Sequence, residues 1–317
     1  MIIPSHIQIE TVHKICNARC KMCVIDLMSG NPDIMSNEDF MFILNKFKKY
    51  KKHIKYISLS GLGETLMDKN VSTKVKIAKK MGFNGIGLPT NCSKLNEKMA
   101  TSLIESGLDT LICSIDGFTK ETHESIRVGT NFNNIVSNVK KFIEIRNKLY
   151  DVNNNIKTRV LIRFIYQDSN RHEWNKYHEY WSSFINKNIG DNVTKFNIHS
   201  CGDKLKNYKS VNDNLKINNL KTNDLKTNDL NNQYNSYICE DIYDRFIIYT
   251  TGNVIFCCAD TNNFNKLGNI FYDDPIKIYN NEVYTKYRKF MNENRMNELE
   301  LCKNCTLAQS RMQLREQ

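Results

Sequence analysis

Short apolar runs alternate with longer segments of helical period from the N-terminus to about Ser200. This alternation is typical of repeated βα units, in which successive strands lie parallel in one sheet. The apolar runs predict six strands, near Gln8–Val12, Tyr56–Ser60, Ile86–Pro89, Thr110–Asp116, Thr158–Tyr166 and Lys195–His199. Six such units favour an open, partial (β/α)6 barrel over a closed barrel of eight strands.

Helices are expected between these strands. The first begins at Ser36, with Asp39 three residues on and apolar residues at helical spacing after it, a pattern that resembles a capping box. Further apolar stripes predict helices over Val71–Lys80, Leu95–Ser106, Phe132–Leu149 and Arg171–Ile185. The predicted fold class is therefore α/β, with the barrel occupying residues 1–202.

The alternation stops after the sixth strand. Residues 203–236 are rich in Asn, Lys and Asp and contain the tandem repeat LKTNDLKTND. Such a segment lacks the apolar surface that an ordered segment buries. We therefore expect a flexible insertion or linker there.

Residues 237–317 form a third section, which is rich in cysteine. Asp241–Thr250 and Asn253–Cys257 predict a hairpin, and Asp274–Asn297 predicts a helical stretch before the closing Cys302-Lys-Asn-Cys305. The section is too short for a large core of its own, so a bound metal or cluster is expected to stabilise it.

The composition excludes several classes of protein. The chain has 317 residues, 40% hydrophobic and 25% charged, as in ordinary globular domains. No run reaches the roughly 18 apolar residues of a membrane span, and the first residues show no signal pattern, so we expect a cytoplasmic protein without a membrane partner. The net charge of +11 comes without a basic stripe interleaved with aromatics, which disfavours nucleic-acid binding. A solvated basic surface explains this charge, and an anionic substrate or a peptide partner is the alternative.

Eleven cysteines in such a chain favour metal or cluster ligation over disulfides. Cys16, Cys20 and Cys23 follow the first predicted strand at x3 and x2 spacing. Three thiolates on one loop hold three irons of a cuboidal [4Fe–4S] cluster and leave the fourth iron open. The alternative is a zinc site whose fourth ligand lies elsewhere, for example His13.

The segment Cys16-Asn-Ala-Arg-Cys20-Lys-Met-Cys23 resembles the signature of the radical S-adenosylmethionine (SAM) superfamily. Ser60-Gly-Leu-Gly-Glu64-Thr resembles the glycine-rich segment of that family. Thr90-Asn91 resembles its Thr-Asn pair, with Cys92 where Gly is usual. Ser114-Ile-Asp116-Gly and Ile126-Arg127-Val-Gly also fit, so the resemblance covers roughly residues 7–200.

The resemblance implies which residues hold the cofactors. The three cysteines are expected to bind a [4Fe–4S] cluster, and the residues expected to bind SAM are Gly61, Gly63, Glu64, Asn91, Ser114, Asp116 and Arg127. It also implies cleavage of SAM to methionine and a 5′-deoxyadenosyl radical, which abstracts hydrogen from a substrate carbon. A flavodoxin- or ferredoxin-type protein is the implied electron donor.

A second set of cysteines comprises Cys239, Cys257, Cys302 and Cys305. Four thiolates suit either a structural zinc or a second [4Fe–4S] cluster without an open iron. Behind a radical SAM barrel the set resembles the SPASM/twitch extension with one auxiliary cluster, as in enzymes of the 2-deoxy-scyllo-inosamine dehydrogenase type. Cys258 is an alternative to Cys257 as a ligand.

Arg163 and Cys201 are the candidate catalytic residues. Arg163 lies toward the carboxyl end of the fifth predicted strand, where α/β barrels bind substrates, and is a candidate substrate contact or base. Cys201 follows the sixth strand and is a candidate hydrogen-atom donor.

Three functions are compatible with these residues. The leading hypothesis is oxidation of an alcohol on a sugar, polyol or aminocyclitol, with the auxiliary cluster as electron acceptor. The second is maturation of a ribosomally made peptide by crosslinking, epimerisation or side-chain oxidation. The third is a non-enzymatic zinc-binding protein.

Overall fold

The computed structural model describes residues 1–152, 157–198, 205, 239–260, 265, 267–303 and 305. Cys201 and, apart from residue 205, the predicted insertion at 203–236 lie outside these residues. The division of the chain at residues 202 and 236 therefore stays a prediction.

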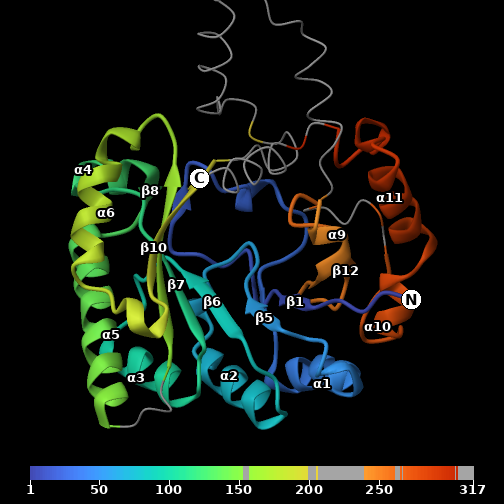
Figure 1. Cartoon of the computed structure of the whole chain (residues 1–317), viewed down its shortest axis with the longest axis horizontal. Coiled ribbons are helices and arrows are strands. Elements are labelled where there is room, and N and C mark those ends of the chain that lie inside the picture. Colours follow the sequence, from blue (N-terminus) through green and yellow to red (C-terminus); the bar gives the residue numbers. More distant parts are fainter. Residues whose placement is uncertain are drawn as a thin grey trace, which may run out of the picture.

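One curved sheet organises the described part of the chain (Figure 1). Its strand order is β10-β9-β7-β6-β5-β1-β11-β12, and neighbouring strands are parallel except β11 and β12. The strands are β1 (His6–Ile9), β5 (Tyr56–Leu59), β6 (Ile86–Thr90), β7 (Thr110–Ser114), β9 (Arg159–Tyr166), β10 (Asn192–Asn197), β11 (Arg245–Ile248) and β12 (Val254–Ile255). All six predicted strands are present, and the α/β partial-barrel fold is confirmed.

The main helices lie on the outside of this sheet (Figure 1). They are α1 (Asn37–Phe47), α2 (Val71–Lys80), α3 (Glu97–Glu105), α5 (Phe132–Val152) and α6 (Trp174–Ser182). Ser36 caps α1 as predicted, because its Oγ accepts a hydrogen bond from the backbone N of Asp39 at 2.9 Å. The sequence does not predict α4 (Lys120–Ile126), which is too short for a helical period to be visible. Within the described ranges, no helix has the length and apolar character needed to cross a membrane.

Alternate residues of each strand face opposite sides of the sheet. On β9, Phe164 is buried on the helix side, where the rings of Trp174 and Tyr177 of α6 pack against it. Arg163, one position away, therefore points to the concave side. The concave side is where polar side chains with functional potential gather.

The first and sixth strands differ from their predicted positions. β1 ends at Ile9 because Glu10 turns into the interior, and Val12–His13 forms a separate short strand, β2, that pairs with β4 (Asp33–Ile34). β10 begins at Asn192 because Gly190, with φ +84°, ends the preceding turn of helix. Glycine adopts this left-handed conformation without the strain of a side chain.

The C-terminal section continues the same sheet. β11 lies parallel to β1, with Phe246 opposite Ile7, and the predicted hairpin is the antiparallel pair β11 and β12. It is shorter than predicted because residues 241–244 form α9 (Asp241–Asp244). The predicted helical stretch is two helices, α10 (Pro275–Tyr279) and α11 (Glu282–Asn292), because the Asn281 side chain caps the start of α11.

A buried ion pair joins α5 to the segment before β10. Arg146 donates from Nη1 and Nη2 to the two carboxylate oxygens of Asp191, at 2.9 and 2.6 Å, and neither side chain is exposed. Asp191 also accepts a hydrogen bond from the backbone N of Val160 on β9, at 2.7 Å. Removal of either partner would leave an uncompensated charge in the interior.

Replacing Arg146 with Ala should lower the free energy of unfolding by about 3–5 kcal/mol, because Asp191 then loses its counter-ion. Lys148→Ala is the matched control, since Lys148 lies on the same helix but pairs with Glu144 at the exposed surface. The control should be nearly neutral. Denaturant unfolding of both variants is the measurement, and equal losses would contradict this role for the buried pair.

Candidate active site

The first three cysteines lie on one loop beyond β2. Cys20 belongs to β3 (Arg19–Cys20), which pairs with β8 (Arg127–Val128) and so ties the loop to the segment after α4. Cys16, Cys20 and Cys23 are free, half-buried thiols, each close enough to another of them to feel its charge. The structure therefore brings the three predicted cluster ligands together.

Burial raises the pKa of all three thiols, that of Cys16 to about 11. Three thiolates side by side would need a cationic centre to compensate their charge. A short loop with three soft sulfur donors fits an iron–sulfur cluster. The residues present therefore fit the predicted cluster, and Cys16, Cys20 and Cys23 are the residues that would hold it.

His13, the fourth ligand of the alternative zinc site, is engaged elsewhere. Its Nδ1 lies 2.8 Å from Oε2 of Glu10, and its Nε2 lies 3.1 Å from the carbonyl oxygen of Ser29. Both ring nitrogens therefore face acceptors, and an imidazole that donates from both nitrogens has no lone pair for a metal. The sequence does not assign a role to Glu10, although a carboxylate directly after an apolar strand is a signal for one.

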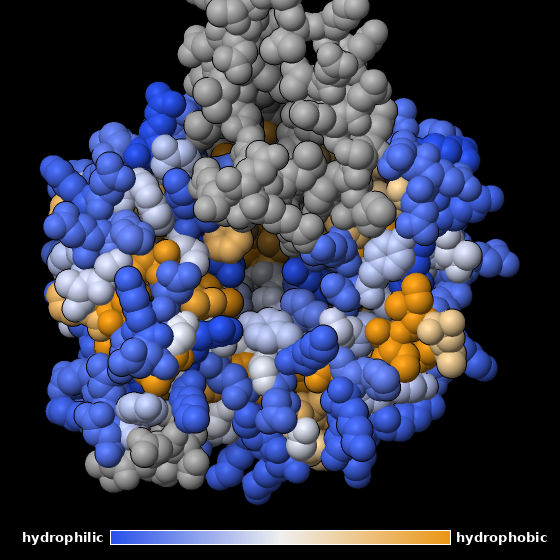
Figure 2. Space-filling view, viewed as in Figure 1, coloured by the Kyte–Doolittle hydropathy of each residue, from blue (hydrophilic) through white to orange (hydrophobic). Residues whose placement is uncertain are grey.

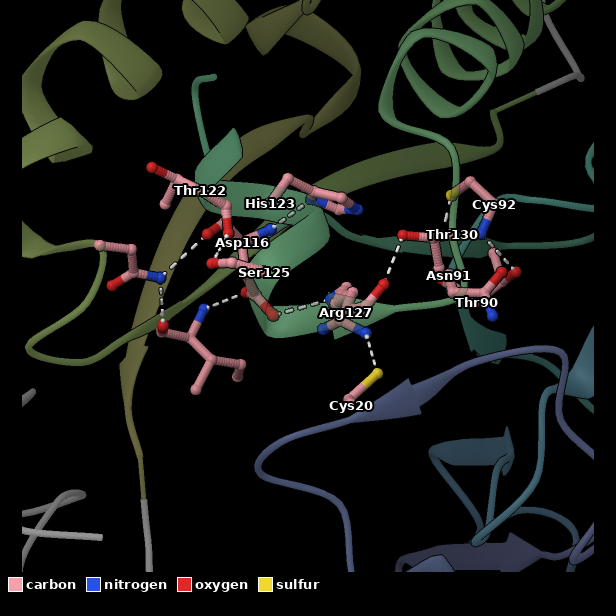
Figure 3. Close-up of polar contacts among 12 residues, drawn as sticks. Cys20, Thr90, Asn91, Cys92, Asp116, Thr122, His123, Ser125, Arg127 and Thr130 are labelled. Carbon is pink, nitrogen blue, oxygen red and sulfur yellow. Dashed lines mark hydrogen bonds and ion pairs between the residues drawn. The ribbon is translucent and has the colours of Figure 1, made fainter. Parts of the chain in front are cut away.

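Arg127 connects the cluster loop to the sheet (Figure 3). Its Nε donates to Oδ2 of Asp116 at 2.7 Å, and its Nη1 lies 3.7 Å from Sγ of Cys20. Asp116 is fully buried just after β7, and its Oδ1 accepts a hydrogen bond from the backbone N of Ile165 at 2.6 Å. Both carboxylate oxygens thus hold groups of the protein, so Asp116 orients Arg127. A direct contact of either residue with SAM stays a prediction.

The glycine-rich segment passes close to the chain that follows β1. A Cβ atom on Gly61 would overlap the side chain of Glu10, and one on Gly63 would overlap the backbone oxygen of Val12. Leu62 donates its backbone N–H to Oε1 of Glu10 at 2.9 Å. Both positions therefore need glycine, because the chain that follows β1 leaves no room for a Cβ atom. Glu10 also links this segment to His13.

The Glu64 carboxylate is buried and joins the end of β5 to the end of β6. Its Oε1 accepts hydrogen bonds from Oγ1 of Thr90 at 2.5 Å and from the backbone N of Leu66 at 3.0 Å, and its Oε2 accepts one from the backbone N of Asn91 at 2.7 Å. Burial raises the pKa of Glu64, while these hydrogen bonds oppose that rise. The side chain holds the segment in shape, and its predicted part in SAM binding stays a prediction.

Asn91 faces the cluster loop. Its Nδ2 donates to Oδ1 of Asn17 at 3.0 Å and lies 3.9 Å from Sγ of Cys16. Cys92 follows with φ +63°, a left-handed conformation that explains why Gly is usual there. Its thiol is fully buried beside Cys113, away from the cluster loop.

Ser114 and Arg163 are neighbours on β7 and β9. Arg163 is half-buried on the concave side, with its guanidinium carbon 4.9 Å from the centre of the Phe196 ring. Cys201, the other predicted catalytic residue, lies outside the described residues.

The second set of cysteines gathers next to β12. Burial raises the pKa of Cys257 and of Cys302. Cys258, Cys302 and Cys305 lie close enough to Cys257 for their charges to raise its pKa further. Cys305 and Cys239 raise the pKa of Cys302 in the same way. The four predicted ligands therefore lie near one another, as a shared auxiliary cluster requires. That they hold such a cluster stays a prediction, and Cys258 remains an alternative to Cys257.

Two family models match the chain. The model of the radical SAM superfamily matches residues 11–156, and the model of the SPASM iron-sulfur cluster-binding domain matches residues 239–306. The chain therefore contains a radical SAM domain at residues 11–156. It carries a C-terminal SPASM domain, and its cofactors are SAM, a SAM-binding [4Fe–4S] cluster and an auxiliary cluster, as the sequence predicted.

Curated relatives of this radical SAM chain match it in part. A probable GTP 3′,8-cyclase of Saccharolobus islandicus is 24% identical over 208 residues, which cover 65% of this chain and 61% of the relative. A tungsten-containing aldehyde ferredoxin oxidoreductase cofactor-modifying protein of Pyrococcus furiosus is 32% identical over 101 residues, or 32% of this chain and 28% of that one. The match thus spans 61% of the length of the cyclase.

Two solved radical SAM structures cover nearly the whole chain. BtrN in complex with AdoMet and 2-DOIA has a TM-score of 0.61 at 17% identity and covers 96% of this chain and 93% of BtrN. SuiB of Streptococcus suis bound to precursor peptide SuiA has a TM-score of 0.64 at 16% identity and covers 98% of this chain and 71% of SuiB. At these identities the likeness shows the fold.

The pair of His13 and Glu10 should make stability depend on pH. The hydrogen bond to Glu10 raises the pKa of His13 above 6.5. The contribution of the protonated His13 to the free energy of unfolding is therefore complete below about pH 6.5, and it is lost as the pH rises through the folded-state pKa. The loss of unfolding free energy caused by His13→Gln should therefore be largest near pH 6 and shrink toward pH 9. Denaturant unfolding at several pH values tests this, with His53→Gln as an exposed control. A loss that grows with pH would contradict the pairing.

Proposed function

We propose that this radical SAM enzyme is an oxidoreductase that oxidises a secondary alcohol on a sugar, polyol or aminocyclitol. A flavodoxin- or ferredoxin-type protein would supply the electron that starts the reaction. The described cysteines form no disulfide with one another, which suits a reducing compartment such as the cytoplasm.

The two cofactor sites have complementary roles in this proposal. When bound, SAM and its cluster supply a radical that takes a carbon-bound hydrogen, and the auxiliary cluster supplies an acceptor for the remaining electron. The role of the chain's own residues is to bind and orient the cofactors and the substrate. Arg127 holds the loop of Cys20, and Gly61 and Gly63 bring the backbone close to the expected amino group of SAM. Arg163 faces the substrate space from the concave side.

The observation that carries the proposal is the connection between the two sets of thiols. β11 pairs with β1, the strand that leads to the cluster loop. Tyr249, between β11 and β12, has its ring 5.6 Å from the ring of His13 and feels the charge of Cys257. The chain thus leads from two adjoining strands to Cys16 and to Cys257, which supports two clusters that serve one reaction.

A ribosomal-peptide maturase is the second candidate. The likeness to SuiB bound to its precursor peptide supports a peptide substrate, and the likeness to BtrN with 2-DOIA supports a small one.

Cys302→Ala should separate SAM cleavage from substrate oxidation. Loss of the auxiliary cluster should reduce the iron content from about eight to about four per chain. Reductive cleavage of SAM to 5′-deoxyadenosine should persist, while alcohol oxidation, screened over sugars, polyols and aminocyclitols, should be lost. Cys113→Ala, at a buried cysteine on β7, is the matched control and should keep both activities.

The wild-type enzyme should consume one SAM for each ketone formed. Oxidation that survives in Cys302→Ala, or a ratio other than one to one, would contradict the oxidoreductase proposal. A precursor-like peptide that is modified while small alcohols are not would favour the maturase.

A further inference from the structure

Three arginines face the concave side of the sheet. On β9, Val160 is buried against the helices, so Arg159 and Arg163 point the other way. Arg245 begins β11, and the phenol of Tyr56 on β5 feels the charges of all three guanidinium groups. Figure 2 shows a hollow in the middle of this face, at the place where Figure 1 draws the interior of the curved sheet. Arg245 pairs with Asp241 at 3.3 Å and Arg159 is exposed, so Arg163 is the one of the three that lies inside without an ion pair among the described residues.

Arg163 is half-buried and, unlike the buried Arg127 and Arg146, makes no ion pair with a carboxylate among the described residues. Arg127 pairs with Asp116 at 2.7 Å, and Arg146 pairs with Asp191 at 2.6 Å. In the part of the chain that the structure describes, the buried Nε of Arg163 has no hydrogen-bond partner, and no ion pair includes this residue. The carboxylate of Asp116 acts on Arg163 only from a distance, because Asp116 already pairs with Arg127.

An unpaired guanidinium in this place costs stability. Burial lowers the pKa of Arg163, and the positive charges of Arg127 and Arg245 act in the same direction, while Tyr56 and Asp116 oppose them. Arginine nevertheless keeps its proton in proteins, so the charge remains. A bound oxyanion would supply the missing partner in a geometry that guanidinium groups match well.

The surroundings of Arg163 combine charge with an apolar wall. Lys195 lies over the Trp174 ring on the helix side, so its neighbour Phe196 faces the concave side. Phe196 is 36% exposed, and its ring adjoins the guanidinium of Arg163. Ser114, at the edge where SAM is expected, is the neighbour of Arg163 across the sheet. A ligand with a carbon skeleton and an anionic group would suit this place.

We propose that the barrel interior binds an oxyanion group of the substrate, a phosphate or a carboxylate, with Arg163 as its main contact. Arg159 adds positive potential to the same space, since its charge also reaches Tyr56, while the charge of Arg245 is offset by Asp241. This inference rests on the proposed function and narrows it, because it favours an anionic sugar or polyol over an aminocyclitol, whose ammonium group the arginines would repel.

Calorimetric titration of the anaerobic holoenzyme with SAM bound tests the inference with three matched probes, which are glucose 6-phosphate, glucuronate and glucose. At least one of the two anionic probes should bind about 10-fold more tightly than glucose, and which of them does so distinguishes phosphate from carboxylate. Arg163→Gln should remove that preference, and Arg163→Lys should retain part of it. Arg171→Gln, at an exposed arginine paired with Asp168, is the control and should change nothing.

Arg163→Gln should leave the Kd for SAM within about 2-fold of the wild-type value, because the proposal places Arg163 against the substrate and not against SAM. Equal binding of the three probes would overturn the inference, as would an unchanged preference in Arg163→Gln. If Arg163→Gln weakens SAM binding as much as it weakens binding of the anionic probe, the inference is overturned too, because Arg163 would then belong to the SAM site. If the anionic probes bind through Arg163 but no alcohol is oxidised, the proposed function fails and the anion site stands.

Discussion

The ion pair between Arg127 and Asp116 holds the cluster loop against the carboxyl edge of the sheet. Asp116 is fully buried and Arg127 almost so, so solvent screens their attraction little and the geometry is kept. The same guanidinium reaches the thiol of Cys20, and the β3–β8 pairing adds backbone hydrogen bonds beside it. This contact places the loop beside Asn91, whose Nδ2 lies 3.9 Å from Sγ of Cys16.

A second constraint is the crowding of the segments that meet the cluster loop. Glu10 fills the space beside Gly61 and holds both Leu62 and His13, while Glu64 holds the end of the next strand. Each carboxylate is buried and accepts several hydrogen bonds, which offsets the cost of its burial. These hydrogen bonds thus fix the edge where SAM is expected to bind, as positioning of a reactive radical requires.

The fold was largely predictable because its signals are local. Strand and helix periods, the cap at Ser36 and the cysteine spacing each lie within a few residues. The parallel pairing of β11 with β1 joins segments far apart in the chain, and no local pattern marks it. The pairing of His13 with Glu10 joins residues only three apart, but it depends on the break between β1 and β2, which no pattern of apolar residues marks. The missing partner of Arg163 could not be predicted, because it depends on which distant segments pack alongside. The sequence pointed to Glu64 as a candidate site residue, whereas the three hydrogen bonds that its carboxylate accepts could not be predicted.

The central claim is that Cys16, Cys20 and Cys23 hold a cluster with one iron open to SAM. Electron paramagnetic resonance of the reduced Cys302→Ala variant tests it most directly, because that variant should keep only this cluster. The account predicts that SAM changes the spectrum and that ¹⁵N in its amino group gives a hyperfine coupling from direct bonding to iron. A spectrum that SAM leaves unchanged, with no nitrogen coupling, would contradict the account.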